Sequence, residues 1–157
     1  MIRRAAISPQ LTTLPSRWDD SAKRRSLALM WSQRRVVDCG LVKRAVVEPL
    51  RSGRTSPGAV CDARPYLLRA ARHVGVPTEH LCPGCEKGNV TNETYVYGDS
   101  LKSQSGAAKI ASQPVEMAHD YDEFRVYVVE VCQGCSWNHL TASFVLGNRP
   151  PDLVGRP

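Results

Sequence analysis

The chain has 157 residues and a mass of 17.3 kDa, a length that allows one domain with a tail and excludes a barrel of about 250 residues. Hydrophobic residues make up 42% and charged residues 23% of the sequence, as in an ordinary globular protein, and no apolar run approaches the roughly 18 to 20 residues that a membrane span needs. The 21 Lys and Arg residues exceed the 15 Asp and Glu residues, and the net charge of +6 is compatible with a nucleic acid as partner.

Residues 1–31 are predicted to be a disordered basic tail. They mix Pro, Ser, Thr and Arg without a steady apolar period, and their six basic residues against two acidic ones give a net charge of +4. The apolar stretch after Arg3 and Arg4 is shorter than the roughly 7 to 15 residues of a secretory signal, so we expect a cytoplasmic protein. Met30 offers an alternative start of translation that would omit nearly all of this tail.

Residues 32–78 are predicted to be helical. With Ser32 as N-cap, the apolar residues that follow fall on one side of a helix that ends before Pro49. A short helix is expected over 57–62, where a Ser-Pro pair opens it. A third helix is expected over 65–74, where a glycine ends it.

The segment 56–74 fits a helix-turn-helix whose second helix would enter a major groove. Residues 32–81 carry nine basic and four acidic residues, a net charge of +5, whereas 82–157 carry a net charge of −3. The arginines expected to contact nucleic acid are Arg51, Arg54, Arg64, Arg69 and Arg72. The alternative is that three short helices pack on a sheet and keep these arginines in water.

Residues 79–148 are predicted to form a zinc-ribbon-like domain. Strand-forming residues are concentrated in three stretches, 90–98, 124–132 and 140–146. The connection 99–123 is expected to be an insertion with a turn or two of helix near 107–111, and 149–157 to be a disordered tail. The predicted fold class is therefore α+β, with a helical segment packed on a small antiparallel sheet.

Two Cys-x-x-Cys pairs carry the strongest chemical signal of the chain. The pairs are Cys82 with Cys85 and Cys132 with Cys135, and each has a glycine directly before its second cysteine. Zinc in structural sites takes four thiolates in a tetrahedron, and a Cys-x-x-Cys turn presents two sulfurs on one side. We therefore predict that these four cysteines bind one structural Zn²⁺.

Other interpretations of the cysteines and histidines stay open. The two pairs could form disulfides in an oxidising compartment, and the first could be a thioredoxin-like redox pair, although no helix is predicted to follow it. His80 or His139 could replace one cysteine as a ligand. Cys39 and Cys61 are expected to be buried side chains inside helices.

The sequence contains no motif of a known catalytic site. It has no glycine-rich phosphate-binding motif, no Gly-x-Ser-x-Gly elbow and no His-x-Glu of a zinc deaminase. A closed shell of four cysteines also leaves no position for a reacting water molecule. We therefore expect a protein that is not an enzyme, with neither a small-molecule substrate nor a membrane as partner.

Several segments together resemble one protein family. They are Val36-Val37-Asp38, Ser52-Gly53-Arg54-Thr55, the run 60–71, Tyr97-Gly98-Asp99 and the run 129–140. Over roughly residues 31–147 the chain resembles a family of small actinobacterial proteins of unknown function, whose members begin close to the position of Met30. This resemblance implies an intracellular actinobacterial context and a zinc-ribbon-like C-terminal half, and it brings no activity with it.

Two functions of different classes remain as hypotheses. The first is a non-enzymatic zinc-ribbon protein that binds DNA or RNA, or is associated with the transcription or translation machinery, through the arginines of its helical segment. The second is a zinc-stabilised adaptor that presents Tyr95, Tyr97 and Trp137 to a protein partner. A third hypothesis is a thiol redox switch, in which oxidation of the cysteines ejects the zinc.

Overall fold

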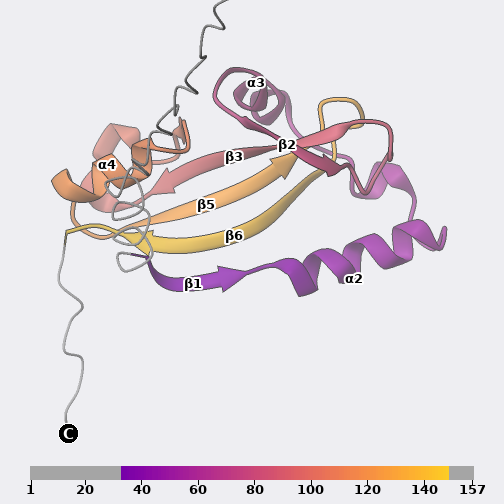
Figure 1. Ribbon diagram of the computed structural model, residues 1–157, viewed down its shortest axis with the longest axis horizontal. Coiled ribbons are helices and arrows are strands. Elements are labelled where there is room, and N and C mark those ends of the chain that lie inside the picture. Colours follow the sequence, from indigo (N-terminus) through magenta and orange to yellow (C-terminus); the bar gives the residue numbers. More distant parts are fainter. Residues whose placement is uncertain (1–32, 149–157) are drawn as a thin grey trace, which may run out of the picture.

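The computed structural model describes residues 33–148, which form helices and a six-stranded antiparallel sheet (Figure 1). The predicted α+β fold class is therefore confirmed. The strands are β1 (Arg34–Asp38), β2 (Val76–Leu81), β3 (Asn89–Tyr97), β4 (Ala108–Lys109), β5 (Phe124–Val131) and β6 (Asn138–Leu146). Their order in the sheet is β1-β6-β5-β3-β2. The short strand β4 pairs with β3 along the same edge as β2, but with later residues of β3.

Three α-helices and two 3₁₀ turns accompany the sheet. They are α2 (Gly40–Arg51), η1 (Pro57–Ala59), α3 (Pro65–His73), η2 (Asp99–Gln104) and α4 (Gln113–Asp120). The third predicted helix is confirmed as α3, which has proline at its first position because the missing N–H of proline costs nothing there. None of the helices within 33–148 is long and apolar enough to cross a membrane.

The prediction of a helix from Ser32 onward is wrong for the residues before Gly40. Residues Arg34–Asp38 form β1, which pairs antiparallel with β6, because their β-branched valines suit an edge strand and β6 offers unpaired backbone groups. The Asp38 carboxylate then accepts a hydrogen bond from the Gly40 N–H at 2.6 Å, where α2 begins. Pro49 does not end this helix, which continues to Arg51.

Three further expectations from the sequence differ from the structure. The short helix over 57–62 is only the single turn η1, so the segment 56–74 lacks the first helix of a helix-turn-helix. The prediction of a helical turn near 107–111 is wrong, because this stretch contains β4 and the helix α4 begins only at Gln113. The strand β2 is absent from the prediction, since its Pro77 and its polar residues hide the strand pattern.

Helices cover both faces of the sheet. Side chains alternate between faces along a strand, so Val126 and Val129 of β5 point to opposite sides. Val126 packs in a cluster with η2 and α4, whereas Val129 packs in a cluster with α3. A third cluster joins α2 to the ends of β3 and β5, and it contains Val47 together with the cysteine pairs. The apolar core therefore runs to the end of the sheet that holds the cysteines.

Candidate metal centre

Two β-hairpins bring the cysteine pairs together. The first pair lies in the turn between β2 and β3, and the second lies in the turn between β5 and β6. Because β3 and β5 pair antiparallel, with Thr91 opposite Val131, the start of β3 lies beside the end of β5. Both turns therefore meet at one end of the sheet.

The two turns have the same backbone geometry. In each, the residue after the second cysteine donates its N–H to the carbonyl of the first cysteine, at 2.9 Å from Glu86 to Cys82 and at 3.0 Å from Ser136 to Cys132. These two residues also share a left-handed conformation, with φ of 52° and 66°. A left-handed residue other than glycine is uncommon, so its occurrence at the same place in both turns shows that they are equivalent.

The four sulfur atoms form one compact group. The Sγ atoms of the four cysteines all lie within 4.8 Å of one another. Cys82 and Cys135 are separated by 3.5 Å between their sulfurs, and Cys85 and Cys132 by 3.8 Å. These side chains could therefore hold a single metal ion, as their spacing in the sequence predicts.

Burial and backbone hydrogen bonds shift the pKa values of these thiols in opposite directions. Burial raises the pKa of Cys82 to about 11, and burial also raises the pKa of Cys135. A hydrogen bond from the backbone N–H of Lys87 lowers the pKa of Cys85 to about 7. Without a cation, burial thus favours the neutral thiols of Cys82 and Cys135, and a metal ion would have to displace their protons in order to bind.

A buried tryptophan forms one wall of the cysteine group. Trp137 is fully buried, and its Nε1 donates a hydrogen bond to Oε1 of Glu130 at 2.9 Å. The other oxygen of Glu130 accepts from Nζ of Lys43 in α2 at 2.6 Å. This chain of contacts ties α2 to the end of the sheet. Trp137 is therefore not on the surface, where the adaptor hypothesis would need it.

Sequence reasoning missed a fifth cysteine beside the group. Cys61 follows η1 and is half-buried, and its Sγ donates a hydrogen bond to Sγ of Cys135 at 3.7 Å. Cys39, by contrast, is a buried residue at the start of α2. Both cysteines were expected inside helices, and neither lies there.

The two histidines near the turns lie outside the sulfur group. His80 is exposed in β2. His139 stacks on Trp137 with a distance of 6.0 Å between ring centroids. Neither is among the residues whose ligand atoms gather within 4.8 Å.

The five arginines singled out in the sequence are exposed but spread over several elements. Arg51 ends α2, 3.7 Å from Oε1 of Glu86. Arg54 follows this helix and donates to the Ser52 hydroxyl at 2.9 Å. The other three are Arg64, Arg69 and Arg72, which lie at the start of α3 or within it. The structure thus does not place these side chains on one recognition helix.

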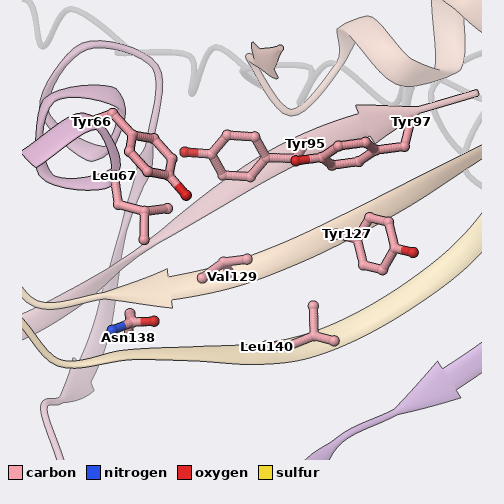
Figure 2. Close-up of a pocket in the computed structure, with 8 residues that line it drawn as sticks. All are labelled: Tyr66, Leu67, Tyr95, Tyr97, Tyr127, Val129, Asn138 and Leu140. Carbon is pink, nitrogen blue, oxygen red and sulfur yellow. The ribbon is translucent and has the colours of Figure 1, made fainter. Parts of the chain in front are cut away.

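A groove lined by tyrosines lies on the face of the sheet that α3 partly covers (Figure 2). Its volume is about 480 Å³. The lining residues are Tyr66, Leu67, Tyr95, Tyr97, Tyr127, Val129, Asn138 and Leu140. Tyr127 lies directly opposite Tyr95 in the β3–β5 register, and its ring meets that of Tyr97 edge to face at 5.5 Å. Sequence reasoning selected Tyr95 and Tyr97 but missed Tyr66 and Tyr127.

A fully buried carboxyl lies next to this groove. The hydroxyl of Tyr95 donates a hydrogen bond to Oε2 of Glu93 at 2.5 Å. Oε1 of Glu93 has no hydrogen-bond partner within the part of the chain that the structure describes. Burial raises the pKa of Glu93 above its usual value of 4.5. The folded state therefore favours the protonated carboxyl.

Replacement of Glu93 by glutamine is expected to remove a pH-dependent loss of stability. A raised pKa in the folded state contributes stability that is fully present at low pH and is lost as the pH rises from the unfolded value through the folded one. Thermal unfolding of Glu93→Gln and wild type, measured under the same conditions over a range of pH, should show that the Tm of the variant rises relative to that of wild type as the pH rises. A constant difference at every pH would contradict this expectation.

The fold and the cysteine group define an α+β protein with a candidate four-cysteine metal site. The model of a family of unknown function (DUF5318) matches residues 30–156, and the chain belongs to this family. Uncharacterised proteins of Mycobacterium bovis and Mycobacterium tuberculosis are each 45% identical to it over 115 residues, which cover 73% of this chain and 84% of the relative. No solved structure matches the chain. The resemblance to an actinobacterial family of unknown function is confirmed.

Proposed function

We propose that this protein is a non-enzymatic, zinc-stabilised protein that binds single-stranded nucleic acid. Zinc would be held by Cys82, Cys85, Cys132 and Cys135 and would fasten the two hairpins to each other. The bases would stack on the exposed tyrosines of the groove, Tyr66 and Tyr97. The observation that carries the binding function is this groove, which is lined by four tyrosines.

The sulfur geometry supports zinc as the metal. A tetrahedral zinc with sulfur ligands at about 2.3 Å has distances of about 3.8 Å between its sulfurs. The separations of 3.5 Å and 3.8 Å in the structure agree with that value. Four cysteines would also complete the tetrahedron and leave no coordination position for water, which is typical of a structural rather than a catalytic site.

The shape and charge of the groove support single-stranded nucleic acid as its occupant. Aromatic rings on an open sheet surface offer stacking platforms for unpaired bases, and nearby cations attract the phosphates. Arg125 is exposed directly opposite Tyr97 in the register of β3 and β5. On α3, Arg69 is exposed three residues after Tyr66, which places both on the same side of the helix.

The acidic groups near the groove do not oppose this binding strongly. Glu93 is fully buried, and burial raises its pKa. The carboxylate of Asp62 accepts a hydrogen bond from Nδ2 of Asn138 at 2.9 Å. Within residues 33–148 Arg125 makes no ion pair, so its charge is available to a phosphate.

Replacement of Tyr97 by alanine is expected to weaken the binding of a single-stranded oligonucleotide by about tenfold, because a stacked base contributes about 1–3 kcal/mol. Tyr97 is 48% exposed, so the change should leave the fold intact. Fluorescence anisotropy with uridine-rich and thymidine-rich single strands would measure the affinity at two salt concentrations, and higher salt should weaken it. Tyr97→Phe keeps the ring and should bind like wild type.

Leu41→Ala is a matched control, since Leu41 is 76% exposed on α2, away from the groove. Unchanged affinity in Tyr97→Ala would reject the groove as the binding surface. Absence of binding by the metal-loaded wild type at low salt would reject nucleic acid as the partner. The half-exposed Tyr66 and Tyr97 would then favour the second hypothesis, an adaptor that binds a peptide in the same groove.

A further inference from the structure

We propose that Cys61 and Cys135 form a disulfide when the protein meets hydrogen peroxide, and that this modification releases the metal ion. The inference rests on the metal site proposed above. It concerns a modification of the chain and is independent of what binds in the groove.

The position of the Cys61 thiol carries this inference. Its Sγ lies 3.7 Å from Sγ of Cys135, which is close to the separations between the ligand sulfurs themselves. Cys61 nevertheless stands outside the group of four that surrounds the metal position. Its sulfur is therefore free to react without first leaving the metal.

The backbone around Cys61 is built to hold this sulfur in place. The N–H of Cys61 donates to the carbonyl of Pro57 at 2.8 Å, and the N–H of Ala63 donates to the carbonyl of Ser136 at 2.8 Å. The second bond fastens the Cys61 segment to the second cysteine turn. In the first turn, a Cβ at Gly84 would lie 3.0 Å from Sγ of Cys61 and 3.5 Å from Sγ of Cys135. A larger residue there would push the two sulfurs away.

Accessibility leaves Cys85 and Cys135 as the ligands that an oxidant can reach, and the position of Cys61 selects Cys135 for the disulfide. Cys82 is 0% exposed and Cys132 is 1% exposed, whereas Cys135 and Cys85 are half-buried. Of these two accessible cysteines, Cys135 is the one with a hydrogen bond from Cys61. A small oxidant can reach the Cys135 sulfur, and the Cys61 thiol lies beside it.

The reaction is a two-electron oxidation in two steps. The Cys135 thiolate attacks one oxygen of hydrogen peroxide, the O–O bond breaks, and a sulfenic acid and hydroxide form. The Cys61 thiol gives up its proton as its sulfur attacks the sulfenic sulfur, the S–O bond breaks, and water leaves as the disulfide forms. Two cysteine sulfurs are oxidised and one peroxide is reduced. The disulfide would remove Cys135 from the four cysteines that would hold the metal, and the remaining three would hold it more weakly.

The test follows metal release and disulfide formation together. Reduced protein with its metal is treated with hydrogen peroxide, free zinc is followed with a coloured chelator, and disulfides are mapped by mass spectrometry of peptides. Wild type should release zinc in step with a linkage between Cys61 and Cys135. Cys61→Ser should release zinc several-fold more slowly and lack this linkage. Cys39→Ala, which removes a buried cysteine outside the group, should behave like wild type.

The possible failures are distinguishable from one another. Equal release by Cys61→Ser and wild type, or a linkage between two of the four ligand cysteines instead, would overturn the inference while leaving the metal site in place. Reduced wild type without bound metal would reject the proposed site and the inference with it. The mapping in wild type does not depend on how well the Cys61 variant folds.

Discussion

Replacement of Cys132 by serine is expected to remove the metal and to abolish cooperative folding at 37 °C. Cys132 is 1% exposed and packs in the cluster that joins α2 to the sheet. Structural zinc sites contribute an apparent binding free energy of about 10–16 kcal/mol, whereas a whole domain is stable by only about 5–15 kcal/mol. Loss of one thiolate therefore removes stabilisation as large as the net stability of the fold.

Zinc content and thermal unfolding of the purified variant would test this expectation. Cys39→Ser is the matched control, because Cys39 is also buried but stands outside the sulfur group. The control should keep about one zinc per chain and lose only a little stability. Retention of stoichiometric zinc by Cys132→Ser, or a Tm within a few degrees of wild type, would contradict the proposed role of the metal.

The second large effect is expected at Trp137, whose replacement by alanine should lower the Tm of the metal-loaded protein by more than about 10 °C. Truncation of a buried tryptophan costs about 3–5 kcal/mol, because the cavity cannot fully collapse. Trp137 is 0% exposed, and its loss would also deprive the buried Glu130 of a hydrogen bond. For a domain of about 100 residues, 1 kcal/mol corresponds to about 4–8 °C in Tm.

Two further variants separate the contributions of packing and hydrogen bonding. Trp137→Phe keeps most of the ring volume but lacks the donor to Glu130, so its Tm should lie between those of Trp137→Ala and wild type. Tyr66→Ala removes an aromatic ring that is 53% exposed and should change the Tm by only a few degrees. Differential scanning calorimetry would rank the three, and a Trp137→Ala curve like that of Tyr66→Ala would contradict the assigned role.

The cysteine group could be predicted from the sequence because its signal is local. A Cys-x-x-Cys turn places two sulfurs together whatever surrounds it, and the strands 90–98 and 124–132 predicted beside the pairs match β3 and β5 closely. Antiparallel pairing of these two strands then brings the turns to the same end. The helix α3 was also predictable, since its capping residues and its apolar stripe lie within one short segment.

The features that depend on pairing between distant segments could not be predicted in the same way. The valines of β1 fit an amphipathic helix as well as a strand, and the choice is decided by the edge of β6, more than 100 residues later. The partners of Tyr95 in the groove depend on the β3–β5 register, which places Tyr127 opposite it. The approach of Cys61 to Cys135 depends on a backbone bond from Ala63 to Ser136, for which the sequence carries no pattern.

The most direct test of the account is X-ray absorption at the zinc edge, measured on protein purified under reducing conditions. Four sulfur neighbours at about 2.3 Å, with about one zinc per chain, are the expected result for a site made of Cys82, Cys85, Cys132 and Cys135. Nitrogen or oxygen neighbours in place of sulfur would show that another residue or a water molecule completes the site. A chain free of zinc, with these cysteines in disulfides, would contradict the proposed metal centre altogether.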